Sequence, residues 1–131
     1  MDAWILRLPK YRPTFGGYLH VTVLHVTADG DETELEVLEM DSCENHLGHL
    51  VEAQIQKGHR RLILDLCAIK QIDAASLGEI VGAFNRAEKS GGELVVAAAD
   101  SNVRKVIRLT GIDRVVPTFD SLQVAVRHFC P

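Results

Sequence analysis

The sequence has few aromatic residues, few cysteines and no long apolar run. Aromatic residues make up 5% of its 131 positions, against 47% hydrophobic residues, so its core must be mostly aliphatic. The three cysteines, Cys43, Cys67 and Cys130, are odd in number and lack paired spacing, which favours reduced thiols. No run reaches the roughly 18–20 apolar residues of a membrane span. The acidic start Met1-Asp2 is unlike a signal peptide. We therefore expect a cytoplasmic chain without membrane insertion.

Positive charge is also scarce. The chain has 14 lysines and arginines against 18 aspartates and glutamates, giving a formal net charge of −4. The basic residues are scattered, whereas a nucleic-acid-binding surface usually shows a basic patch or stripe. We expect no binding to nucleic acid.

Hydrophobic periodicity predicts an α/β fold. Residues 1–17, with Pro9, Pro13 and Gly16-Gly17, are interpreted as an N-terminal arm that includes a short strand at Trp4–Leu8. Residues 18–26 alternate in polarity, Asp29-Gly30 predicts a turn, and residues 34–40 resume the extended pattern, so a hairpin is expected. Helical and strand patterns then alternate: helices from residue 42 to Gly58 and over 77–89, 103–110 and 122–129, with strands over 61–66, 93–99 and 115–119. Residues 18–131 are thus expected to form one domain with a mixed four- to five-stranded sheet, an N-terminal hairpin, parallel strands and about four helices.

Four segments between Gly58 and Phe129 resemble the STAS family, the fold of anti-sigma-factor antagonists. They are Leu64-Asp65-Leu66, Ile72-Asp73-Ala74-Ala75-Ser76-Leu77-Gly78, Gly91-Gly92-Glu93-Leu94-Val95-Val96 and Leu109-Thr110-Gly111-Ile112. The resemblance implies a regulator that binds a partner protein, often an anti-sigma factor with serine-kinase activity. It places the partner-binding surface at Asp73, Ala74, Ala75, Ser76, Leu77 and Gly78. It also implies that phosphorylation of the second serine of an Asp-Ser-Ser-Gly motif switches the interaction off.

This sequence departs from that motif, because both serine positions are alanines. Ala75 occupies the phospho-acceptor position and has no hydroxyl, and Ser76 stands where the family has glycine. The chain is then either constitutively competent to bind, or phosphorylated on Ser76 instead, or it uses Ser76 only to support the first helical turn. A shift of one residue turns a helical side chain by about 100°, so a kinase tuned to the usual geometry is expected to miss Ser76.

The neighbouring residues have structural interpretations as well. Asp73 is expected to cap the helix, and a contact with the partner kinase or its metal is compatible with that. Gly78 is interpreted as permitting close helix–strand packing. Asp65 is expected at the strand end under the same helix terminus, as a partner contact or a polar strand end.

We expect no catalysis, no metal and no cofactor. Cys43, His46 and His49 recur every three residues, so on a helix they fan around the axis and converge poorly on one ion. Ser76 lacks the Gly-x-Ser-x-Gly context of a hydrolase nucleophile, and no glycine-rich phosphate loop is present.

Two classes of function remain open at this point. The first is a partner-switching regulator of the anti-sigma-factor-antagonist type. The alternative is a non-switching STAS scaffold or a subunit bound to a transport ATPase, which the missing acceptor serine favours. A homodimer also stays open, with residues 1–17 added as an edge strand of a second copy.

Overall fold

The computed structural model describes residues 2–9, 18–41 and 47–130. The strands are β1 (Ala3–Arg7), β2 (Tyr18–Val26), β3 (Glu32–Asp41), β4 (Arg61–Asp65), β5 (Glu93–Ala97) and β6 (Thr118–Phe119). The helices are α1 (Leu47–Gln56), α2 (Ala74–Lys89), α3 (Ser101–Leu109) and α4 (Leu122–Phe129), with a 3₁₀ turn at Ile112–Arg114.

The six strands form one mixed sheet in the order β3-β2-β1-β4-β5-β6. Strands β1, β2 and β3 pair antiparallel, whereas β1–β4, β4–β5 and β5–β6 pair parallel. The predicted α/β class, hairpin, parallel strands and four helices are therefore confirmed, with six strands instead of four to five.

The N-terminal segment takes a different place from the predicted arm. Residues Ala3–Arg7 form β1 in the interior of the sheet, hydrogen-bonded to β2 on one side and β4 on the other. Both faces of β1 are buried, with Ile5 and Leu6 at 0% exposure. Because β1 already has two neighbours, it cannot pair as an edge strand with a second copy. The boundary expected at residue 17 thus does not separate the first strand from the domain.

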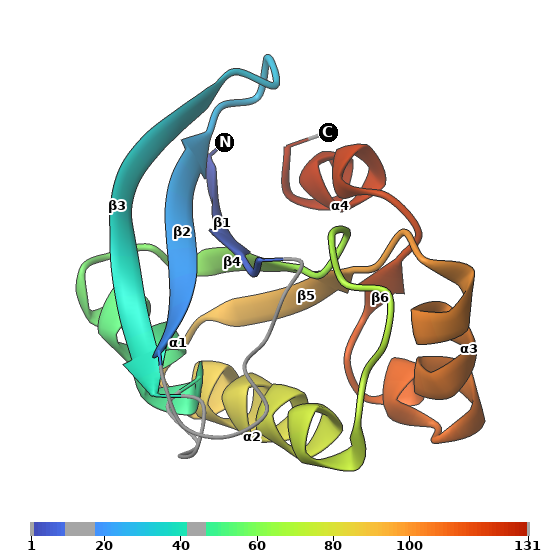
Figure 1. The fold of residues 1–131 in the computed structure, drawn as a ribbon. Coiled ribbons are helices and arrows are strands. Elements are labelled where there is room, and N and C mark those ends of the chain that lie inside the picture. The colour runs from blue at the N-terminus through green and yellow to red at the C-terminus, as the bar shows by residue number, and fades with distance from the viewer. Residues whose placement is uncertain (1, 10–17, 42–46, 131) are drawn as a thin grey trace.

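The sheet is covered unequally on its two faces. Helices α1 and α2 lie together on one face, and α4 lies on the other, over the end of the sheet formed by β4, β5 and β6 (Figure 1). The larger cluster joins Leu6, Val23, Leu64 and Val96 to helical residues such as Val51 and Ile80. A smaller cluster packs the opposite face of the same strands against α4. Strands β4 and β5 contribute to both clusters because they are apolar at nearly every position.

Some local details differ from the expected elements. The acidic Glu79 lies on a buried part of α2, with 8% exposure. The last strand is shorter than residues 115–119. Val115 follows the 3₁₀ turn, and only Thr118 and Phe119 are strand residues in register with β5. The expected start of the first helix at residue 42 lies outside the described residues.

Candidate partner-binding site at the amino end of α2

Asp73 fixes the start of α2. Its backbone is extended, with φ −104° and ψ 173°, and its Oδ1 accepts a hydrogen bond from the Ser76 backbone N–H at 2.8 Å. The backbone carbonyl of Asp73 accepts the first helical bond, from the N–H of Leu77 at 3.1 Å. This is the geometry of an N-cap, in which a side-chain oxygen satisfies an amide that the helix itself leaves unpaired. The predicted capping role of Asp73 is therefore present.

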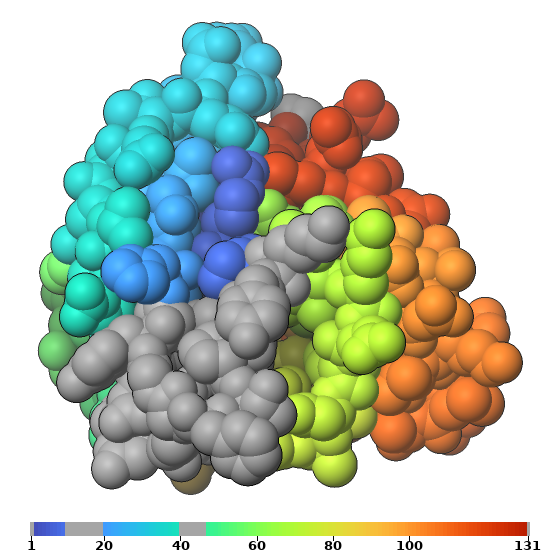
Figure 2. All heavy atoms as spheres, viewed as in Figure 1, coloured from blue at the N-terminus to red at the C-terminus, as the bar shows by residue number. Residues whose placement is uncertain are grey.

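The first turn of α2 divides into an exposed side and an anchored side. Asp73, Ala74 and Ala75 are exposed, while Leu77 at 8% and Ile80 at 3% exposure hold the helix against the sheet. Figure 2 shows the segment that opens α2, in yellow-green, on the surface of the molecule. The segment in which the sequence predicted a docking surface thus lies at a helix terminus. Four of its six residues are exposed, Ser76 is half-buried, and Leu77 is buried and anchors the helix instead of contributing to the surface.

Gly78 contradicts its interpretation as a packing residue. It is exposed, and a Cβ built on it would have no heavy atom within 4 Å. The close approaches involve Gly48 and Gly92 instead, whose added Cβ atoms would lie 2.7 Å from Arg86 Cδ and from Ile55 Cδ1. Gly78 therefore belongs to the exposed surface of the first turns.

Ser76 differs from the two alanines that precede it. It is half-buried and lines a small apolar hollow beneath the start of α2. The buried Glu79 also lines it, together with Leu8, Pro9, Leu47, Leu66, Ile69, Ile72 and Ile80. Sequence reasoning missed this hollow, although the apolar Ile69 and Ile72 in the connector between β4 and α2 were a signal for it.

Asp65 lies away from this helix terminus. Leu64 and Leu66 belong to the cluster on the α2 face, and Asp65 projects toward the opposite face of the sheet. Its Oδ2 accepts from Arg7 Nε at 2.8 Å, and its Oδ1 accepts from the Cys67 N–H at 2.9 Å. With 5% of its side chain exposed, Asp65 is a buried structural ion-pair partner, so its expected place under α2 is wrong.

Nucleophiles and metal ligands are poorly arranged for chemistry. Burial, followed by the hydrogen bond and charge of Asp65, raises the pKa of the Cys67 thiol to about 11, so it stays protonated at neutral pH. Within the described ranges, no three His, Cys, Asp or Glu side chains gather as a metal site. Cys43 and His46 lie outside those ranges. His49 is exposed, and its Nδ1 lies 3.3 Å from Arg86 Nη1. Among the described helices, none has the length and apolarity to cross a membrane.

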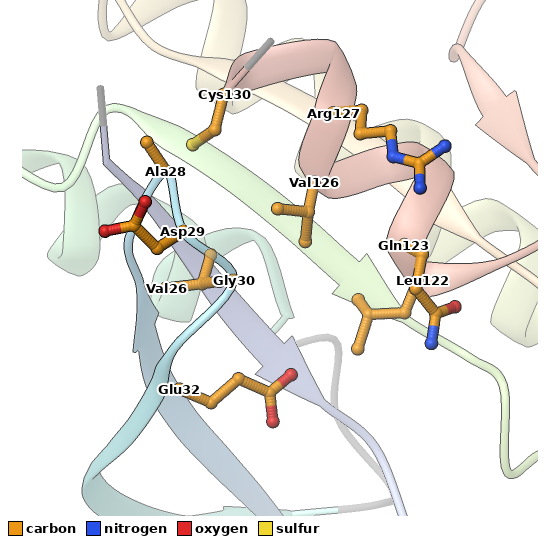
Figure 3. Close-up of a pocket in the computed structure, with 10 residues that line it drawn as sticks. All are labelled: Val26, Ala28, Asp29, Gly30, Glu32, Leu122, Gln123, Val126, Arg127 and Cys130. Atoms are coloured by element: carbon orange, nitrogen blue, oxygen red, sulfur yellow. The ribbon is translucent and has the colours of Figure 1, made fainter.

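A second hollow lies on the face of the sheet that α4 covers. It has a volume of about 290 Å³ and separates the β2–β3 turn from α4. Figure 3 shows Asp29 and Glu32 on the hairpin side, with Leu122, Val126 and Arg127 on the helix side. None of the residues between Asp73 and Gly78 lines it, so it is separate from the start of α2.

Residues 37–125 match the family model described as STAS domain, and this range includes β4, α2 and the whole segment from Asp73 to Gly78. The chain belongs to the STAS domain family. The expected family is thereby confirmed. The matched range begins at residue 37, whereas the segments that resemble the family in the sequence begin after Gly58.

Similar proteins carry names related to sigma-factor control. A candidate anti-sigma factor antagonist of Thermotoga maritima is 32% identical over 74 residues, which are 56% of this chain and 66% of that protein. A candidate anti-sigma factor antagonist of Bordetella bronchiseptica, BtrV, is 31% identical over 59% of this chain and 66% of its own length. The matched part of this STAS chain thus spans just under two thirds of these relatives.

Solved structures agree with the fold. The NMR structure of the protein TM1081 superposes with a TM-score of 0.52 at 29% identity, covering 64% of this chain and 74% of that one. A crystal structure of TM1081, a candidate anti-sigma factor antagonist from Thermotoga maritima, gives the same TM-score over 62% of this chain. The STAS domain therefore has the mixed sheet and helices of its structural neighbours.

Proposed function

We propose that this STAS protein is a non-enzymatic regulator of the anti-sigma-factor-antagonist type. It docks a partner protein, an anti-sigma factor with serine-kinase activity, through the amino end of α2. The observation that carries the proposal is the exposed and capped first turn, where Asp73, Ala74 and Ala75 face solvent. The names of the similar proteins support the same class of partner.

We further propose that binding is not switched by phosphorylation at the family position. Ala75 is exposed, as an acceptor residue would need to be, but its side chain is a methyl group. Ser76 is half-buried against the apolar hollow, which reduces access for a kinase. Binding of the partner is then set by the concentrations of the two proteins. The exposed side of this turn has no hydroxyl group that could accept a phosphate, with its charge of about −1.5 to −2.

The alternative is a fixed scaffold or a subunit of a transport ATPase. The alanine at position 75 is the observation that favours it, since a permanent subunit needs no switch. Both functions use the same exposed turn, so the identity of the partner separates them.

Affinity purification from the source organism, with quantitative mass spectrometry against an Ala75→Glu bait, tests this choice. A serine kinase or sigma regulator that is recovered by the native chain and lost with the variant supports the leading function. A transport ATPase with the same pattern supports the alternative. Recovery of all proteins equally by both baits contradicts docking through α2.

The purified partner then allows a direct measurement. Ala75→Glu is expected to weaken binding by at least about tenfold, or about 1.4 kcal/mol, because it places a charge on the docking surface. Ala53→Glu, also at an exposed helical alanine, is the matched control and should bind as the native chain does. With ATP and the kinase, Ala75→Ser should gain phosphate that the native chain does not. Stoichiometric phosphate on Ser76 of the native chain would refute the non-switching proposal.

A further inference from the structure

Strand β3 forms one outer edge of the sheet. It runs from Glu32 to Asp41, and among the described strands its one neighbour is β2, so one row of its backbone N–H and C=O groups faces away from these strands. Figure 1 shows β3 on the left-hand side of the sheet, away from α3 and β6 on the other side. Such an edge can accept an additional strand, and proteins usually protect it with lysine, proline, bulges or short length. At 10 residues β3 is long, and its sequence ETELEVLEMD has neither lysine nor proline.

The charge of this edge has one sign. β3 contains Glu32, Glu34, Glu36, Glu39 and Asp41, and no basic residue. Arg7 approaches Glu32 at 3.4 Å and Lys57 approaches Glu36 at 3.0 Å. Across the part of the chain that the structure describes, no ion pair neutralises Glu34 or Glu39, and both are exposed. A lysine- or arginine-bearing segment complements these carboxylates.

Apolar side chains are interspersed with the acids. Leu35 and Val37 are 48% and 50% exposed. The register with β2 shifts at Val23/Leu24, where Glu36 and Glu34 are the partners, so Leu35 is the extra residue of a bulge. An added strand would remove part of this apolar surface from water. The acids oppose pairing of β3 with a second copy, because like charges on opposed strands repel.

We propose that the edge of β3 from Glu32 to Glu39 is a second docking surface, which accepts an extended basic segment of a partner protein as an added strand. Main-chain hydrogen bonds hold such a segment, and the carboxylates select its charge. This surface is independent of the amino end of α2. The two sites can therefore be tested separately.

A nine-residue peptide of alternating lysine and valine is a suitable probe, with the same peptide methylated on every central backbone nitrogen as its control. Isothermal titration is expected to show a Kd on the order of 100 μM for the first peptide and at least tenfold weaker binding for the second. Amide resonances of β3 in the ¹⁵N-labelled protein should shift most. Raising the ionic strength should weaken binding, since exposed charges are screened.

Paired charge reversals locate the surface. The double variant Glu34→Lys/Glu39→Lys is expected to raise the Kd of the peptide at least tenfold. The control variant Glu88→Lys/Asp113→Lys changes two exposed acids elsewhere and should change this Kd less than twofold. Ala75→Glu should leave it unchanged, whether or not the proposed function holds. Equal binding of the methylated peptide, an equal loss in the Glu88/Asp113 variant, or no binding at about 1 mM peptide would overturn the proposal. Dimerisation of the protein through β3 in sedimentation experiments would overturn it in favour of a second copy.

Discussion

The guanidinium of Arg7 donates through Nε to Oδ2 of Asp65 at 2.8 Å, across 58 positions of sequence. The two residues are register partners on the parallel strands β1 and β4. The Asp65 side chain is 5% exposed and that of Arg7 is 36% exposed. The pair therefore joins a buried carboxylate to a partly solvated cation at the junction between β1, the last of the antiparallel strands, and β4 of the parallel part of the sheet.

Removing Arg7 should destabilise the fold. Arg7→Met leaves the Asp65 carboxylate buried, with the Cys67 N–H as its remaining donor among these contacts. We expect the free energy of unfolding to fall by about 1–3 kcal/mol. This is less than the cost of breaking a fully buried pair, because solvent screens the partly exposed Arg7. Urea unfolding measures the loss. The double variant Arg7→Met with Asp65→Leu should recover part of it. A double variant that is less stable by the sum of both single losses would contradict the coupling.

The pH dependence of stability should include a contribution from His59. Its ring stacks on Trp4 with centroids 4.4 Å apart, and its Nδ1 lies 2.8 Å from Gln54 Oε1. Burial lowers the pKa of His59 from its ordinary value of 6.5, with smaller contributions from Lys57 and His25 that Glu36 opposes. The unfolded chain then binds this proton more tightly, so the stabilising contribution is complete above pH 6.5 and is lost as pH falls through the lowered pKa.

Trp4 is the only tryptophan, so its fluorescence reports on unfolding close to His59. Urea midpoints measured between about pH 7.5 and 5 are expected to fall less steeply for His59→Phe, which keeps an aromatic ring beside Trp4 but cannot titrate. Comparing slopes removes any constant change in stability that the substitution causes. Identical slopes in the native chain and the variant would rule out the contribution of His59.

Two glycine substitutions should have opposite effects. Gly78→Ala adds a methyl group into open space within α2, so we expect stabilisation by roughly 0.5–1 kcal/mol from helix propensity. Gly92→Ala brings a Cβ to 2.7 Å from Ile55 Cδ1 and 3.0 Å from the Arg60 carbonyl oxygen, so it should destabilise. Thermal unfolding of the two variants checks the contrast. Destabilisation by Gly78→Ala would contradict the expectation that a methyl group at this position meets open space.

The cap at Asp73 can be separated from its charge. Asp73→Ala removes the acceptor of the Ser76 N–H and should cost about 1 kcal/mol of stability. Asp73→Ser retains a capping oxygen without the carboxylate and should stay within a few tenths of a kcal/mol of the native chain. Chemical denaturation of both variants provides the comparison. An equal loss in both would mean that the carboxylate charge, rather than the hydrogen bond, supports the helix.

Local patterns in the sequence determined the elements and the candidate site. Alternation in residues 18–26 and 34–40 predicted the hairpin, and apolar runs predicted the strands β4 and β5. The segment from Asp73 to Gly78 predicted the start of α2, with Asp73 as its cap. These signals are short-range, because capping and periodicity depend on residues a few positions apart. The exposure of Ala74 and Ala75 follows from the same helical period.

Only the tertiary structure decided which distant segments meet. It placed β1 inside the sheet, paired Arg7 with Asp65, buried Glu79 beside Ser76 and left Gly78 in open space. A short apolar strand such as β1 can pair with several neighbours, and its choice depends on how the whole sheet packs against its helices. Periodicity indicates the side of a helix on which a residue lies, whereas its burial also depends on what the connecting segments place over that side.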